Sequence, residues 1–145
     1  MSLYRRILLA VDLSPDSAFI GQRALALATA CDAQLHLIHV VEPIAPISFP
    51  TELAGPSVVA TQVELIDTAQ RQIDRLAQQL GIAKSNGKVV VGSTKHEVIR
   101  AAAEAGADLV VIGSRERHGL ALLLKHTDDA VVHRAPCDVL AVRLG

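Results

Sequence analysis

Short uninterrupted runs of apolar residues alternate along the chain with segments whose apolar residues recur at helical spacing. The first run, RRILLAV at residues 5–11, shows no alternation of polar and apolar positions, which is typical of a strand covered on both faces in a parallel sheet. Four further strands are predicted at residues 34–40, 88–92, 108–113 and 138–144.

Helices are predicted between these strands, at residues 15–31, 57–80, 95–105 and 120–133. Ser14 is the expected N-cap of the first helix, with Pro15 at its first position. Thr94 and Glu97 have the spacing of a capping box at the start of the third. Alternation of strands and helices predicts the α/β class: a five-stranded parallel, doubly wound, Rossmann-like sheet flanked by four helices.

A long loop is predicted between the second strand and the second helix. Residues 42–56 contain four prolines, which lack the backbone donor that helices and sheets require. Elsewhere we find no internal repeat, no low-complexity segment and no boundary between domains, so residues 1–145 are interpreted as one domain.

Composition narrows the possible functions. With 14 basic and 15 acidic residues, the chain lacks the basic surplus with which nucleic-acid binders neutralise phosphates. The two cysteines, Cys31 and Cys137, are too few for a disulfide framework and indicate a reducing compartment. No apolar stretch reaches the length of a transmembrane helix. We therefore expect a cytoplasmic protein that binds neither membranes nor nucleic acid.

Candidate ligand-binding residues follow the strands, because open parallel sheets bind ligands beyond the carboxyl ends of their strands. The segment from Gly113 to Gly119 combines two glycines with Arg115 and Arg117 after the fourth strand, which suits a phosphate group. An ordinary glycine-containing turn with a solvated basic rim is the alternative interpretation. Residues Asp12–Ser14, Val41–Glu42 and Gly92–Thr94 follow the other strands of this edge.

Motifs for catalysis and for metal binding are absent from the sequence. It contains no Gly-x-Ser-x-Gly nucleophile elbow, no Walker A lysine motif, no Cys-x-x-Cys and no His-Glu-x-x-His. Asp12 and Asp16 are open to interpretation as a carboxylate pair, but Asp16 is equally an acidic residue favoured at a helix start. We therefore predict no catalytic residue and no metal site.

Four segments together resemble the universal stress protein family, of the bacterial UspA type. They are ILLAVDLSPDS, LHLIHVVEP, GADLVVIGSRERHG and HRAPCDVLAVRL, in this order and spacing over nearly the whole chain. The resemblance implies the sheet order 3-2-1-4-5 and a homodimer joined through the last strand, residues 138–144. The apolar character of that edge strand favours a second copy independently, because exposed apolar edges need covering.

Many members of this family bind ATP, with Mg²⁺, and the resemblance carries several positions over. Asp12 and Val41 match the residues that hold the ribose and the adenine. The segment after the fourth strand supplies the other matching positions and their neighbours, namely Gly113, Ser114, Arg115 and Gly119.

The phosphate-binding half of the motif departs from the family pattern. Glu116 replaces its first glycine, Lys125 and His126 replace the Gly-Ser pair before Thr127, and five residues stand where nine are usual. A carboxylate at Glu116 repels a triphosphate, and lost glycines prevent close backbone approach. We therefore expect a stress-response protein that acts through protein or small-ligand interactions without tight ATP binding. The alternative is an ATP-binding regulatory module with at most slow hydrolysis, in which Lys125, His126 and Thr127 meet the phosphates.

Overall fold

The structure, a computed structural model, describes residues 2–44, 53, 55–114, 131 and 133–144 of the chain. Its elements follow one another as β1 (Arg6–Ala10), α1 (Ser17–Cys31), β2 (Gln34–Val41), α2 (Pro56–Leu80), a short 3-10 helix (Lys84–Asn86), β3 (Gly87–Val91), α3 (Thr94–Ala105), β4 (Leu109–Ser114) and β5 (Asp138–Arg143). Each of the five predicted strands is present, with ends that differ by one residue at most.

The five strands form one parallel sheet in the order β3-β2-β1-β4-β5, which confirms the predicted fold class and sheet order. The central strand β1 pairs with β2 on one side and with β4 on the other, so that Leu9 lies opposite both Leu37 and Val111. The winding direction reverses between β1 and β4, which is the switch point of a doubly wound sheet.

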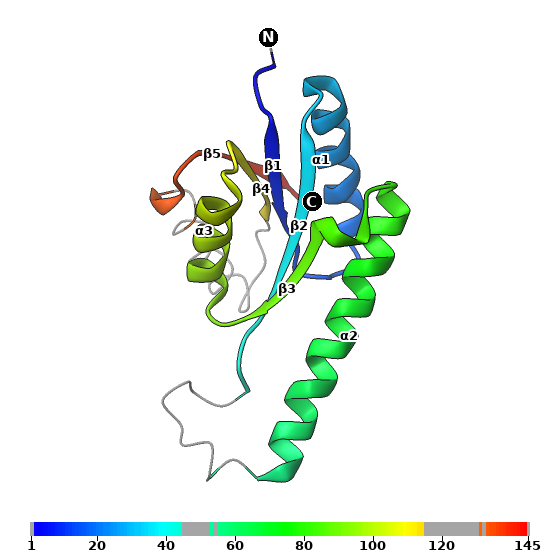
Figure 1. The fold of residues 1–145 in the computed structure, drawn as a ribbon, viewed down its shortest axis with the longest axis vertical. Coiled ribbons are helices and arrows are strands. Elements are labelled where there is room, and N and C mark those ends of the chain that lie inside the picture. Colours follow the sequence, from blue (N-terminus) through cyan, green and yellow to red (C-terminus); the bar gives the residue numbers. More distant parts are fainter. Residues whose placement is uncertain (1, 45–52, 54, 115–130, 132, 145) are drawn as a thin grey trace.

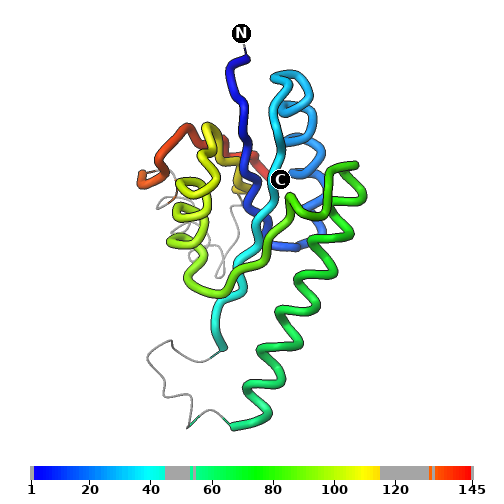
Figure 2. Tube along the Cα trace, viewed as in Figure 1, coloured from blue at the N-terminus to red at the C-terminus, as the bar shows by residue number. Residues whose placement is uncertain are grey.

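Helices cover both faces of this sheet, as Figures 1 and 2 show: α1 and α2 lie against one face, and α3 lies against the other. Ile7 and Leu9 of β1 pack on the α1 and α2 side with Ile73, whereas Leu8 packs on the α3 side with Val98. Because successive side chains of a strand point to opposite faces, a strand buried on both faces must be apolar throughout. This explains the uninterrupted apolar run in the sequence.

The predicted start of α1 is wrong by two residues. The helix begins at Ser17, and its N-cap, Asp16, makes no side-chain capping bond. Ser14 instead belongs to the preceding turn, in which its carbonyl oxygen accepts from the Ser17 N–H at 3.0 Å and its hydroxyl accepts from the Asp16 N–H at 3.3 Å. The Ser-Pro-Asp signal therefore builds a turn that leads into the helix.

The predicted capping box of α3 is also wrong. The N-cap is Ser93, and Thr94 is the first residue of the helix. The Thr94 hydroxyl is engaged across the molecule, because it donates to Glu42 Oε1 at 3.0 Å, while the Thr94 N–H donates to the same oxygen at 3.4 Å. A partner 52 residues away in the sequence thus replaces the local cap.

Helix α2 is longer than the sheet that it covers. Its 25 residues begin at Pro56, but its buried side chains all lie between Ala69 and Leu80, and its first half runs past the end of the sheet (Figure 1). None of the described helices is long and apolar enough to cross a membrane. The fourth predicted helix, residues 120–133, falls almost wholly outside the described residues, as does much of the predicted loop at 42–56.

Candidate functional site

The chain leaves β1 through a fixed turn that begins at Asp12. Asp12 Oδ1 accepts hydrogen bonds from the Ser14 N–H at 2.9 Å and from the Ser17 hydroxyl at 3.4 Å. Leu13, between them, adopts the left-handed conformation with φ 59°, which few residues other than glycine adopt without strain. The Asp12 carboxylate thereby holds a strained backbone at the carboxyl end of the central strand.

The end of β2 lies beside this turn and carries two polar side chains. His39 Nδ1 lies 2.7 Å from the carbonyl oxygen of Val11, so the imidazole connects β2 with the residue that follows β1. Glu42 follows the strand and binds the start of α3 through Thr94. Between them, Val41 is buried in the sheet.

An open pocket of about 360 Å³ lies where these strand ends meet α2. Its lining residues are Asp12, Leu13, His39, Val40, Val41, Glu42, Leu65, Thr68, Ala69 and Gln72. The structure therefore brings Asp12 and Val41, the two positions matched to nucleoside binding, into one pocket. The lining residues that the structure describes include two carboxylates and an imidazole but no lysine or arginine, so this part of the pocket favours a neutral or cationic ligand that presents hydrogen-bond donors.

Gly113 and Ser114 end the neighbouring strand β4 and are not among the residues that line this pocket. A Cβ atom on Gly113 would lie 2.6 Å from Ile20 Cδ1, closer than real Cβ atoms approach, and 3.0 Å from Leu144 Cδ1, which is a tight contact. The Ser114 carbonyl oxygen accepts from the Leu144 N–H at 2.8 Å, continuing the pairing of β4 with β5. Close packing against these two side chains therefore favours a residue without a side chain at position 113.

The remaining residues predicted for the phosphate side lie outside the described residues. They are Arg115, Gly119, Lys125, His126 and Thr127, together with Glu116 at the first altered glycine.

Sequence reasoning missed the wall of the pocket that α2 supplies. Leu65, Thr68, Ala69 and Gln72 recur at spacings of three and four residues, which places them along one side of a helix. That spacing was a usable signal, but the sequence does not show which strand ends the helix crosses. No motif in the sequence marks His39, whose contact with the Val11 carbonyl oxygen depends on how the strands are arranged.

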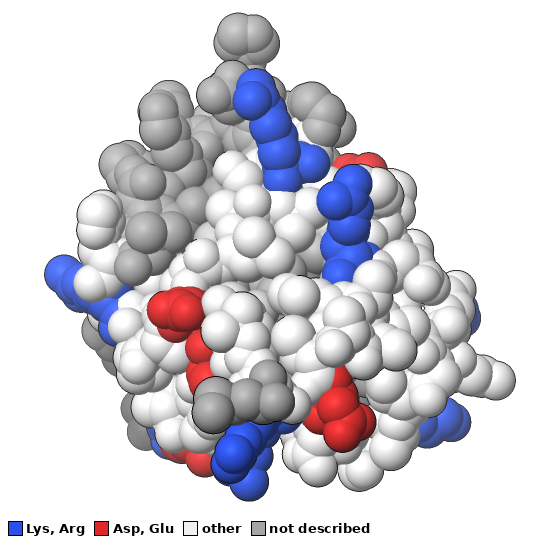
Figure 3. Space-filling view, turned by 90° about the horizontal axis from the view of Figure 1, so that it is seen from above, with Lys and Arg blue, Asp and Glu red and all other residues white. Residues whose placement is uncertain are grey.

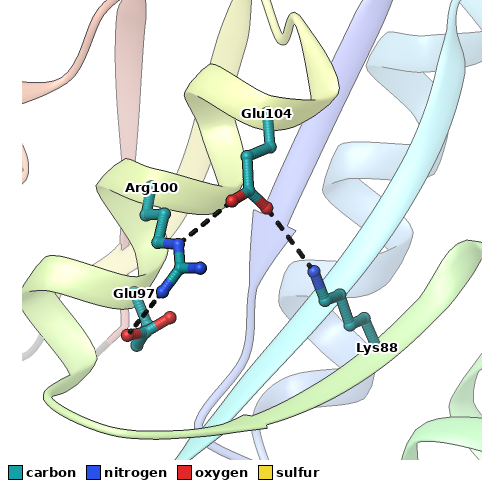
Figure 4. A network of polar contacts seen from close by, with 4 residues as sticks. All are labelled: Lys88, Glu97, Arg100 and Glu104. Atoms are coloured by element: carbon teal, nitrogen blue, oxygen red, sulfur yellow. Dashed lines mark hydrogen bonds and ion pairs between the residues drawn. The ribbon is translucent and has the colours of Figure 1, made fainter.

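A smaller hollow of about 220 Å³ lies on the opposite face of the sheet, between β3 and α3. Its charged residues form the network in Figure 4, in which Glu104 binds both Lys88 (3.8 Å) and Arg100 (3.0 Å), and Arg100 also reaches Glu97 (3.8 Å). The two glutamates raise the pKa of Arg100. Because its charges are paired with one another, this hollow presents no unbalanced charge to a ligand.

Charge is distributed evenly at the end of the molecule where β1 begins. In Figure 3, basic and acidic side chains are interspersed over that face. Among residues 2–44, 53, 55–114, 131 and 133–144, no cluster of three or more His, Cys, Asp or Glu side chains is arranged to hold a metal ion.

Comparison with known proteins gives a consistent result. The profile of the universal stress protein family matches residues 3–143. Universal stress protein A homolog 2 of Coxiella burnetii is 38% identical over 145 residues, which cover 99% of this chain and 98% of that protein. Universal stress protein A homolog 1 of the same organism is 34% identical over 139 residues, which cover 96% of each chain.

Solved structures share the fold. Universal stress protein UspA from Lactobacillus plantarum superposes with a TM-score of 0.76 at 23% identity, over 99% of this chain and 100% of that one. A universal stress protein in complex with cAMP superposes with a TM-score of 0.63 at 24% identity, over 97% of this chain and 98% of that one.

Proposed function

Because this chain belongs to the universal stress protein family, we propose that it is a cytoplasmic, homodimeric stress-response protein that acts through protein or small-ligand interactions and does not hold ATP tightly. Its small ligand is a neutral nucleoside, bound in the pocket between the ends of β1 and β2 and helix α2. This proposed function includes no catalytic step.

The observation that carries this proposal is the chemistry of the pocket lining. Among the lining residues that the structure describes, Asp12 and Glu42 bring two carboxylates to the pocket and none brings a guanidinium or ammonium group. Carboxylates accept hydrogen bonds from ribose hydroxyls but repel phosphates. The altered glycine and serine positions in the sequence, Glu116, Lys125 and His126, point in the same direction.

Thermal unfolding with added ligands tests the proposal. Protein stripped of co-purified ligand is titrated with adenosine and, separately, with ATP and Mg²⁺; a ligand that binds the folded state raises Tm in proportion to the logarithm of its concentration over Kd. We expect adenosine to raise Tm at millimolar concentration. We expect ATP with Mg²⁺, titrated separately, to raise Tm no more than adenosine does. Micromolar stabilisation by ATP, or ATP recovered from the purified protein, would overturn the expectation of weak ATP binding.

An ATP-binding regulatory module, with at most slow hydrolysis, is the second candidate. It is favoured by the meeting of Asp12 and Val41 in one pocket and by a fold neighbour whose structure holds cAMP. The double variant Glu116→Gly, Lys125→Gly tests it. If the altered positions are what weaken ATP binding, the affinity for ATP rises in this variant; if the affinity stays the same, the shortened segment between Gly119 and Lys125 is the obstacle.

Dimerisation through β5 is part of the proposal. β5 is the last strand of the sheet order, and Leu140 on it is 41% exposed. Antiparallel pairing with the β5 strand of a second copy covers this edge with a symmetric interface. Light scattering at micromolar concentration is expected to give twice the mass of one chain, and Leu140→Lys to shift the mass toward that of the monomer. A monomer mass for the wild type would remove dimerisation from the proposal.

A further inference from the structure

His39 stands in the pocket with its ring orientation fixed by the main chain. The side chain is half-buried and lines the pocket, and its Nδ1 lies 2.7 Å from the carbonyl oxygen of Val11. A carbonyl oxygen only accepts hydrogen bonds, so Nδ1 must carry the proton and donate. In the neutral imidazole, Nε2 then bears a lone pair and acts only as an acceptor.

The partner that fixes this tautomer is itself held in place. Val11 is 5% exposed, and its N–H donates to the carbonyl oxygen of Ile38 at 2.9 Å. His39 therefore lies on β2, and Val11 directly follows β1, the strand with which β2 pairs at the centre of the sheet. The protonation pattern of the ring is set by the register of these strands and needs no ligand.

Acceptor groups accompany His39 in the described lining of the pocket. Asp12 and Glu42 contribute carboxylates from the ends of β1 and β2, and the residues that α2 contributes to the pocket, among them Thr68 and Gln72, include no titratable group. Negative groups and hydrogen-bond acceptors prevail among the described lining residues. A ligand that presents another acceptor to them leaves its own acceptor and theirs without a hydrogen bond.

We propose that His39 is a specificity-determining residue of this pocket, whose Nε2 accepts a hydrogen bond from a donor on the base of the bound nucleoside. The inference rests on the proposed function, in which the pocket binds a neutral nucleoside, and it names the class: purine nucleosides with an exocyclic amino group. Adenosine is accepted. Inosine carries an oxygen acceptor in place of the exocyclic amino group, and purine riboside carries neither the amino group nor the oxygen. Both are expected to bind about tenfold more weakly than adenosine.

Calorimetric Kd values for adenosine, inosine and purine riboside test this in wild type and two variants. His39→Asn keeps an amide donor for the Val11 carbonyl but removes the acceptor at Nε2, so the ratio of inosine to adenosine Kd falls to about one while Tm stays near the wild-type value. His39→Gln places an amide near Nε2 and gives up the Val11 bond, so part of the preference for adenosine returns at lower Tm. If His39 only stabilises the fold, the preference for adenosine is expected to persist in His39→Asn, and His39→Gln is expected to restore none of it.

His36→Asn is the matched control. His36 is half-buried on the same strand, three residues earlier, and successive residues of a strand face opposite sides, so it lies on the α3 side of the sheet. Its variant retains the wild-type ratio of Kd values. A change in that ratio equal to the change in His39→Asn would overturn the assignment to His39.

The outcomes separate the two proposals. If the wild type binds the three nucleosides equally, or His39→Asn keeps the preference, the specificity role is wrong and the nucleoside site stands. If no nucleoside binds, both fail. A third measurement needs no ligand: ¹⁵N NMR of the histidine rings is expected to show the Nδ1–H tautomer for His39, and an Nε2–H tautomer would overturn the inference even where adenosine binds.

Discussion

Glu42 and Thr94 are joined by two hydrogen bonds to the same carboxylate oxygen, from the Thr94 hydroxyl at 3.0 Å and from its N–H at 3.4 Å. Glu42 lines the candidate pocket, whereas Thr94 opens a helix on the other face of the sheet. The acidic side chain also lies at the amino end of α3, where the helix dipole favours negative charge. One carboxylate thus connects the pocket with the start of α3.

Thr94→Val removes the shorter of these bonds and leaves the backbone contact. Because the Glu42 and Thr94 side chains are not buried, we expect the free energy of unfolding to fall by only about 1 kcal/mol. Urea denaturation measures the change. Thr61→Val is the control, because the exposed Thr61 hydroxyl donates only to a carbonyl oxygen of its own helix, that of Ser57. Equal losses in the two variants would show that the Glu42 contact adds nothing.

Gly113→Ala tests whether packing dictates the glycine at the end of β4. The new Cβ would lie 2.6 Å from Ile20 Cδ1, and overpacking of this kind costs about 1–3 kcal/mol. Ile20→Val removes that Cδ1 atom, so the double variant is expected to lose less stability than the two single changes together. Simple additivity in a double-mutant cycle would show that the alanine is tolerated without displacing Ile20.

Asp12→Ala is expected to weaken binding of adenosine at least tenfold, because it removes the carboxylate that lines the pocket and that fixes the turn through Ser14 and Ser17. Calorimetric titration measures the affinity. Asp67→Ala is the control, since Asp67 is an exposed acid on α2 that is not among the lining residues. Unchanged affinity in Asp12→Ala would refute the role of Asp12 in binding.

Cys137 is predicted to be a slow nucleophile. Burial raises the pKa of its thiol first of all, and the negative charges of Asp138 and Asp108 raise that pKa further. Because the thiolate is the reactive form, alkylation by iodoacetamide at pH 8 should be slower than that of free cysteine and should accelerate only at higher pH. The rate is measured in Cys31→Ser, which leaves Cys137 as the single thiol.

Asp138→Asn provides the matching test of the cause. It removes one of the charges that raise the Cys137 pKa, so alkylation at pH 8 should become faster than in the Cys31→Ser parent. Its side chain also accepts from the Tyr4 hydroxyl at 3.0 Å, and that hydrogen bond is the main reason that the pKa of Tyr4 is raised. A Cys137 that reacts as fast as free cysteine in the parent would contradict the account.

The sheet was predictable from the sequence because its cause is local. Where a strand is buried on both faces, as β1 is at Ile7, Leu8 and Leu9, its residues must be apolar, and that run is visible in the sequence alone. The helix starts were less predictable because hydroxyl groups have competing partners. Ser14 serves a turn and Thr94 serves Glu42, and only the folded chain decides between these uses.

The candidate site likewise has residues that the sequence marks and a residue that only the folded chain reveals. Asp12 and Val41 were found because each lies at the carboxyl end of a strand, at a position that the family resemblance marks. The role of His39 depends on the pairing of β1 with β2, in which Ala10 lies opposite Ile38. No spacing along the sequence expresses that register, so a histidine within a strand is easily interpreted as packing alone.

The central position of β1 has a consequence for the newly made chain. Ile7 finds its partner Leu35 soon after it is synthesised, but its partner on the other edge, Leu109, comes 74 residues later than Leu35. At roughly 5–20 residues per second, the ribosome needs about 4–15 s to bridge that interval. During this time the edge of β1 that will pair with β4 keeps its backbone N–H and C=O groups unpaired. The nascent protein therefore passes through an incomplete sheet that can associate with other chains until β4 is made.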